Sequence, residues 1–235
     1  MTEPIQYYGT YTDDFGATAI VIENDFENLH VEIDGVKFKG AEFSDMELIN
    51  RSSYTEKQLE RFTFWPIAIL NIETLEQSLC NCSFEFPISQ IIIDKTTHLE
   101  ISGTLIIKCT LGKERPQPTG GLEFEEVRLK LSTQQFDFEG EDKNGFFEVA
   151  LDKIQRKFDG RYRFKNCYGC MYGDYSIYGQ SSFGTMLCFV KQKDSYKGAR
   201  NKHEYMELAG DYQQVQEIYC CDQYEIRTPG AGYRG

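Results

Sequence analysis

Hydrophobic and polar residues alternate along two stretches of the chain with the period of two that is typical of β-strands. In HLEISGTLIIKCTL, residues 98–111, most polar positions share one face, and Gly103 is the one gap on the apolar face. The stretch SLCNCSFEF, residues 78–86, alternates in the same way. We therefore predict two strands with one core-facing side each, which carries Leu99, Ile101, Leu105, Ile107, Cys109 and Leu111 in the first and Cys80, Cys82, Phe84 and Phe86 in the second.

Other patterns extend the prediction of a β-rich fold to residue 145. Asp34-Gly35 lies between two short alternating runs, which is a strong local signal for a tight hairpin. The apolar phase slips near Glu125 and Glu126, and a bulge there would account for the slip. Residues 1–145 are therefore predicted to form an antiparallel β-sandwich or open barrel. Further strands are expected at residues 6–11, 18–23, 88–93 and 136–139.

The pattern changes after residue 145. FFEVALDKIQRKF, residues 146–158, spaces its apolar residues for a helix of about three turns. Residues 146–235 are therefore predicted to form a linker helix and a smaller, cysteine-rich α+β region. Within that region we expect short strands at residues 161–166, 184–190 and 215–221, and a helical segment within residues 191–210.

The chain has 8 cysteines but shows no secretory signal and no run of about 18 apolar residues, so we expect a cytoplasmic protein that does not enter a membrane. In that reducing compartment, clustered thiols bind metal more often than they form disulfides. Cys167 and Cys170 form a C-x-x-C pair beside Gly169 and Gly173, and glycines that adopt positive φ suit a metal knuckle. A redox pair usually opens a helix, and no helical pattern follows here. Cys80, Cys82 and Cys109 are instead expected to pack in the core.

A structural zinc ion needs four thiolate or imidazole ligands, so the C-x-x-C pair requires two more. Cys188 follows in a predicted strand, and Cys220 and Cys221 end the last predicted strand. Adjacent residues of an extended chain point to opposite faces, so only one of these two cysteines is expected to bind. His203 is an alternative ligand. We predict zinc as the cofactor, bound by Cys167, Cys170 and Cys188 with one further ligand.

The charge is unevenly distributed along the sequence. The whole chain carries 25 basic and 37 acidic residues, a formal charge of −12. Residues 152–203 hold 11 Lys or Arg against 4 Asp, a net +7, which leaves −19 for the rest. This excess disfavours nucleic acid and anionic membranes as partners. It favours a basic protein partner, of the kind that an inhibitor or immunity protein binds, because opposite charge accelerates the encounter.

Two groups of residues are candidates for binding a partner. Cations alternate with aromatic residues along one short strand: they are Arg161, Arg163 and Lys165. They could bind an anion or single-stranded nucleic acid, or they could form a solvated strand edge or pair with the acidic N-terminal part. Tyrosine and arginine near the cysteines and at the C-terminus suit a protein interface, although the tyrosines could also pack over the cysteines. These are Tyr172, Tyr175, Tyr178, Tyr233 and Arg234.

The familiar catalytic motifs are missing from the sequence. It has no G-x-x-x-x-G-K-[ST], no G-x-G-x-x-G after a strand and no H-E-x-x-H, and none of its three histidines accompanies a nucleophile in a known signature. A zinc-dependent enzyme is the alternative, with an open metal position and Asp174 as the nearest acid. A non-catalytic role is therefore the first expectation.

Four motifs fill the last third of the chain: CYGC at 167–170, DYSIYG at 174–179, FGTMLC at 183–188 and CDQYEIR at 221–227, which GYRG at 232–235 follows. Together they resemble a family of short uncharacterised bacterial proteins with C-x-x-C, D-Y-S-x-Y-G, F-G-T-M-L-C and C-x-x-[FY]-E-x-R…G-Y-R-G. The resemblance implies a bacterial, intracellular protein and favours Cys221 over Cys220 as the fourth ligand. Asp222 departs from the proline expected there. The resemblance implies no activity, so we predict a non-catalytic, zinc-stabilised protein-binding module.

Overall fold

The computed structural model divides the chain into two compact units, each of which combines several segments. Unit 1 comprises Met1–Ile88, Ile106–Lys130 and Glu141–Phe146, and unit 2 comprises Ser89–Leu105, Leu131–Gly140 and Phe147–Gly235. The division expected between residues 145 and 146 stays a prediction. The residues whose structure is described are 3–67, 76–116, 120–178, 182–208 and 210–233.

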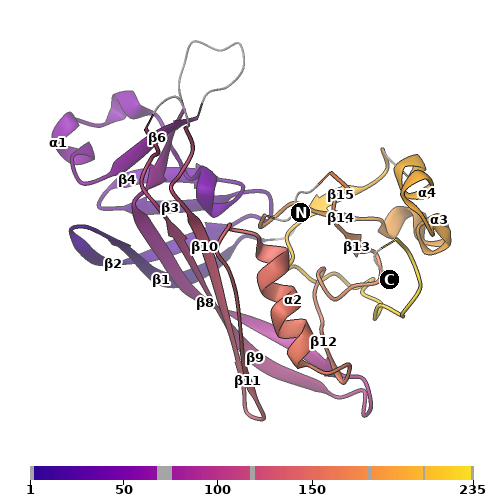
Figure 1. The fold of residues 1–235 in the computed structure, drawn as a ribbon. Helices are drawn as coiled ribbons and strands as arrows, with labels where there is room; N and C mark the ends of the chain where they lie inside the picture. Colours follow the sequence, from indigo (N-terminus) through magenta and orange to yellow (C-terminus); the bar gives the residue numbers. More distant parts are fainter. Residues whose placement is uncertain (1–2, 68–75, 117–119, 179–181, 209, 234–235) are drawn as a thin grey trace. The chain divides into compact units, whose positions relative to one another are not determined.

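Unit 1 is an antiparallel sheet with strands in the order β11-β10-β9-β8-β1-β2-β3-β4-β5-β7-β6, an open path among the described strands (Figure 1). The prediction of a mainly antiparallel β fold is confirmed. Its own strands are β1 Ile5–Asp13, β2 Gly16–Asn24, β3 Leu29–Ile33, β4 Val36–Gly40, β5 Glu47–Leu48, β6 Thr63–Ile67 and β7 Glu76–Cys80. Parts of β8 Cys82–Asp94, β9 Glu100–Leu111, β10 Glu125–Thr133 and β11 Asp137–Asp142 belong to each unit. Short helices are η1 Phe43–Asp45, η2 Arg51–Ser53 and α1 Glu56–Leu59.

The hairpin between β3 and β4 forms where the sequence predicts it. Ile33 pairs with Val36, and the two residues between them, Asp34 and Gly35, both have positive φ, at 49° and 81°. A two-residue turn of this kind matches the right-handed twist of the strands. The local turn sequence is therefore sufficient to set the register of these two strands.

The stretch of residues 78–86 is buried as predicted but forms two strands rather than one. Cys80 and Cys82 are both buried, yet Asn81 between them has a φ of 52° and separates β7 from β8. Asparagine tolerates this left-handed conformation better than most residues. Cys109 is also buried in β9, so the prediction that these three cysteines pack in the core is confirmed.

Unit 2 packs the helix α2 Phe147–Lys157 against strands through aromatic rings. The predicted helix is confirmed, with Phe147, Ala150, Leu151 and Ile154 on its buried face. The ring of Phe158, just after the helix, lies 5.2–6.0 Å between centroids from four other rings. Contacts of this type add to the area that the rings bury. The four rings belong to Phe136, Phe138, Tyr162 and Phe164.

The rest of unit 2 contains a strand that pairs with β8, a second small sheet and short helices. The predicted strand at residues 161–166 is present as β12 Tyr162–Phe164, which is antiparallel to β8. The small antiparallel sheet has the order β13-β14-β15, with β13 Gly173–Asp174, β14 Met186–Cys188 and β15 Gln213–Val215. The helices are η3 Val190–Gln192, α3 Lys193–Gly198 and α4 Lys202–Glu207, which confirms the helical segment expected there.

The last predicted strand is wrong in its position. The strand ends at Val215, and the backbone turns at Glu217 and Ile218 before it reaches Cys220 and Cys221. Glu217 explains the turn, because its carboxylate is fully buried and accepts a hydrogen bond from the Tyr175 hydroxyl at 3.0 Å. The apolar pattern of this segment reflects burial in a loop rather than in a sheet.

Candidate metal centre

Five thiols from three separate segments of unit 2 lie close enough to influence one another's pKa. Burial raises the pKa of Cys167 well above its ordinary value of 9.0, and the neighbouring thiols raise it further. Cys188 is affected in the same way, first by burial and then by Cys170 and Cys221. We call this group the cysteine cluster: it consists of Cys167, Cys170, Cys188, Cys220 and Cys221.

Backbone hydrogen bonds bring these segments together. The amide of Cys167 donates to the carbonyl oxygen of Tyr219 at 2.6 Å, which fixes the C-x-x-C segment beside the chain that leads to Cys221. The amide of Cys170 donates back to the oxygen of Cys167 at 3.2 Å. Gly173 pairs with Cys188 across β13 and β14. Main-chain contacts thus position the cysteines independently of any bond between their sulfur atoms.

The two glycines of the C-x-x-C segment serve close packing rather than positive φ, so the expected reason for them is wrong. A Cβ atom at Gly169 would lie 1.8 Å from the carbonyl oxygen of Phe164, and a Cβ at Gly173 would lie 2.2 Å from that of Cys167. Neither glycine has a positive φ. The segment needs glycine because other backbone passes where a side chain would begin.

All eight cysteines are free thiols, and they differ in their exposure. Cys167, Cys170 and Cys188 are buried, Cys221 is half-buried, and Cys220 is exposed. Within the described ranges, no three side chains among His, Cys, Asp and Glu are already arranged to hold a metal ion. The donor set is chemically suited to zinc, since thiolates are preferred ligands of structural zinc sites.

A buried arginine near the C-terminus supports the same segment. Arg227 is 8% exposed and donates from Nη2 to the carbonyl oxygens of Cys170, at 3.1 Å, and Gly173. Its Nη1 donates to the Tyr196 hydroxyl at 3.1 Å. Nε of Arg227 has no hydrogen-bond partner among the described residues. The sequence offered one signal for this role, the arginine of the CDQYEIR motif.

The acid proposed for the enzyme alternative, Asp174, is enclosed by other side chains. It is 3% exposed, and its Oδ2 accepts a hydrogen bond from the Tyr196 hydroxyl at 2.7 Å. Burial raises the pKa of Tyr196, and the neighbouring Asp174 adds to the effect. In this arrangement the carboxylate stabilises the polar interior of unit 2.

The predicted interface tyrosines divide into buried and exposed residues. Tyr172 and Tyr175 are buried, and Tyr172 belongs to the hydrophobic core that surrounds Cys170. Tyr178 is 72% exposed, and Tyr233, also exposed, lies with its ring 4.9 Å from that of Tyr205. Arg234 lies outside the described residues. Tyr178 and Tyr233 therefore remain available to a partner in this structure.

The basic residues of β12 and its neighbours are used within unit 2. Arg161 contacts Asp94, with 2.8 Å between Nη2 and Oδ2, and Lys165 contacts Glu100 at 2.5 Å. The Nε of Arg163 donates to the carbonyl oxygen of Gly169 at 3.4 Å. The contacts of Arg161 and Lys165 correspond to the alternative in which the cations pair with acidic residues of the N-terminal part.

Grouping the charges by compact unit gives a clearer contrast than grouping them by sequence. Unit 1 contains 22 acidic and 11 basic residues, a formal charge of −11. Unit 2 contains 15 acidic and 14 basic residues, a formal charge of −1. The basic segment of residues 152–203 is therefore balanced within its own unit, and the acidic excess lies almost entirely in unit 1.

The chain combines a unit with an open antiparallel β-sheet and a unit that contains the cysteine cluster, and this combination defines its structural class. The chain belongs to a family of unknown function, DUF6304, whose model matches residues 5–173. The match includes Cys167 and Cys170 but ends before the motifs at residues 174–235. That these motifs are typical of the family, and that the protein is bacterial, therefore stay predictions. No curated protein and no solved structure matches the chain significantly. No helix in the described part of the chain is long and apolar enough to span a bilayer.

Proposed function

We propose that the chain is a non-catalytic protein-binding module, in which the acidic unit 1 binds a basic protein and zinc stabilises unit 2. The observation that carries the proposal is the charge of −11 on unit 1 beside −1 on unit 2. Such a field accelerates encounter with an oppositely charged partner and repels nucleic acid. A sandwich or open-barrel packing of unit 1 and a bacterial, intracellular setting belong to the same proposal.

The zinc part of the proposal rests on the cysteine cluster. Buried thiols with a raised pKa remain protonated at neutral pH, and they gain little from lying near one another unless a cation binds them. Cys167, Cys170, Cys188 and Cys221 would hold the ion as thiolates. Zinc so bound adds its binding free energy to the stability of the folded unit.

Metal analysis of gently purified, untagged protein tests this part. We expect about one zinc per chain in the wild type and a large loss in Cys170→Ser. Cys80→Ala is the matched control, because Cys80 is a buried thiol of unit 1 that lies outside the cysteine cluster. Wild-type protein without stoichiometric metal would contradict the zinc assignment.

Identification of proteins that co-purify from the native host tests the binding function. We expect a basic partner whose association rate falls steeply as salt is raised, because screening weakens long-range attraction. Retention on a phosphate-rich column at low salt would instead favour the anion or nucleic-acid alternative. Substrate turnover by purified protein that has no protein partner would favour the enzyme alternative.

A further inference from the structure

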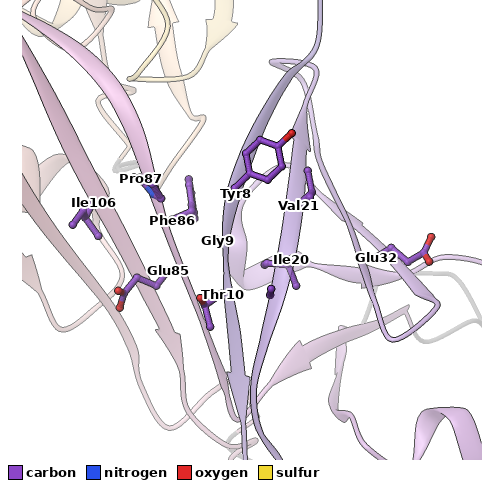
Figure 2. Close-up of a pocket in the computed structure, with 11 residues that line it drawn as sticks. Tyr8, Gly9, Thr10, Ile20, Val21, Glu32, Glu85, Phe86, Pro87 and Ile106 are labelled. Carbon is purple, nitrogen blue, oxygen red and sulfur yellow. The ribbon is translucent and has the colours of Figure 1, made fainter.

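Unit 1 has an open hollow of about 680 Å³ on the outer face of its sheet (Figure 2). Two rows of neighbouring side chains line it. Tyr8 pairs with Val21. On β3, Glu32 follows Val31, the partner of Ile22, and so extends the same row. Thr10 pairs with both Ala19 and Glu85 in the second row. Pro87 and Ile106 complete the lining from β8 and β9. We call this region the hollow.

The hollow lies where β1 and β8 stop pairing. Their register covers Thr10 to Thr12 of β1 and ends at Glu85 of β8. Pro87, two residues farther along β8, has no N–H with which to continue a ladder. At Gly9 the strands are so close that a Cβ would lie 2.4 Å from the carbonyl oxygen of Glu85. The strands therefore meet tightly at Gly9 and leave the adjacent outer surface uncovered.

The lining of the hollow is apolar at its centre and acidic at its edges. Tyr8 is 69% exposed and Val21 is 40% exposed, which is unusual for large apolar residues that lie side by side. Figure 2 shows Glu32 and Glu85 on opposite sides of Tyr8. Glu32 has no ion-pair partner within the described residues, and Glu85 contacts Lys108 at 3.1 Å with both side chains about half exposed. A new cation can therefore approach either carboxylate.

We propose that the hollow binds an extended segment of a basic protein, in which an apolar side chain fills the centre and Lys or Arg lies two residues to each side. Glu32 and Glu85 are three strand spacings apart across the sheet and lie in rows two residues apart along the strands, so their Cα atoms are about 16 Å apart. Residues i and i+4 of an extended peptide are about 13 Å apart, and i, i+2 and i+4 share one face. Long basic side chains reach the remaining distance. The proposal rests on the proposed function in taking the partner to be a basic protein.

A labelled peptide, Thr-Lys-Thr-Phe-Thr-Lys-Thr, tests the proposal by fluorescence anisotropy at low salt with the full chain. We expect saturable binding that weakens about two- to fivefold in Glu32→Gln and in Glu85→Gln, and about tenfold in the double variant. Glu27→Gln makes the same charge change outside the hollow and should have no effect. Replacing the peptide's Phe by Ala, or Tyr8 of the protein by Ser, should also weaken binding.

Other results would overturn the proposal. Equal binding by a peptide with adjacent lysines, or by both glutamine variants, would show attraction to unit 1 in general rather than to the hollow. Concentration-dependent dimers in sedimentation that Tyr8→Ser abolishes, without peptide binding, would assign the hollow to a second copy of the chain. A basic host partner that binds both glutamine variants as tightly as the wild type would support the proposed function and overturn the role of the hollow. Peptide binding to the hollow without any basic host partner would support the hollow and contradict the proposed function.

Discussion

Nη2 of Arg227 donates a hydrogen bond to the carbonyl oxygen of Cys170 at 3.1 Å, so a residue near the C-terminus holds the C-x-x-C segment. The same guanidinium contacts Gly173 and Tyr196, and Tyr196 in turn contacts Asp174. A buried cation that donates to several acceptors contributes more to folding stability than a cation at the surface, because its removal leaves those acceptors unpaired in the interior.

We therefore predict that Arg227→Met destabilises the protein by roughly 2–4 kcal/mol. Arg115→Met is the matched control, since Arg115 is exposed and also donates to a backbone carbonyl, that of Glu123 at 3.1 Å. The control should lose less than about 1 kcal/mol. Urea titrations followed by circular dichroism measure the stability of both variants. Equal losses in the two variants would argue against a special role for the buried hydrogen bonds of Arg227.

The two adjacent cysteines of the cysteine cluster should differ in their effect on metal content. Both cysteines raise the pKa of Cys167, but only Cys221 is half-buried and also raises the pKa of Cys188, whereas Cys220 is exposed. We expect Cys221→Ser to lose most of the zinc and Cys220→Ser to retain it, as elemental analysis beside total protein would show. The reverse pattern would make Cys220 the fourth ligand.

Local signals in the sequence predicted the parts of the fold that local physics determines. The Asp34-Gly35 turn needs two residues with positive φ, and the helix of residues 147–157 needs only a repeated apolar spacing, so both are visible in a short window. The break at Asn81 is different, because an alternating pattern continues through it. A left-handed residue inside such a pattern leaves no periodic signal.

Tertiary contacts determined what the sequence left open in the site. Tyr172 and Tyr178 have similar neighbours in the sequence, yet one is buried in the core around Cys170 and the other is exposed. The segment before Cys220 looks like a strand, but the buried Glu217 turns it. Spacing identified the cysteines as a group. Which of them lie nearest to one another depends on how segments 54 positions apart, at Cys167 and Cys221, fold together.

The ion pair between Asp94 and Arg161 predicts a specific dependence of stability on pH. The guanidinium of Arg161 lowers the pKa of Asp94 from its ordinary value of 3.8 to about 2. A carboxylate whose pKa is lower in the folded state stabilises the fold at pH values above 3.8 and loses this contribution as the pH falls to about 2. The contribution should therefore be constant from neutral pH down to mild acid.

Asp94→Asn removes the charge and keeps an oxygen that can accept the hydrogen bonds from the amides of Thr96 and Thr97. We expect this variant to have a lower urea midpoint than the wild type at pH 7 and a much smaller difference at pH 2, where folded Asp94 is partly protonated. Asp137→Asn controls for the general loss of one negative charge in unit 2. A difference that persists unchanged at pH 2 would mean that the charge of Asp94 contributes nothing.

Two glycine substitutions in unit 2 should change stability in opposite directions. Gly169→Ala places a Cβ 1.8 Å from the carbonyl oxygen of Phe164, and main chain cannot move aside as a flexible side chain would. We expect a loss of roughly 1–3 kcal/mol or more, as for other overpacked sites. Gly198→Ala, in α3, meets nothing within 4 Å and should instead stabilise by about 0.4–1 kcal/mol, because alanine has less freedom in the unfolded chain.

Thermal or urea unfolding of both variants measures the contrast, and zinc content measured on the same samples connects it to the site. If close packing at Gly169 sets the shape of the C-x-x-C segment, Gly169→Ala should lose metal along with stability, while Gly198→Ala keeps its metal. Loss of stability with full metal content would show that the cysteine cluster tolerates a displaced Phe164 backbone. Unchanged stability in Gly169→Ala would contradict the close approach of the two backbones itself.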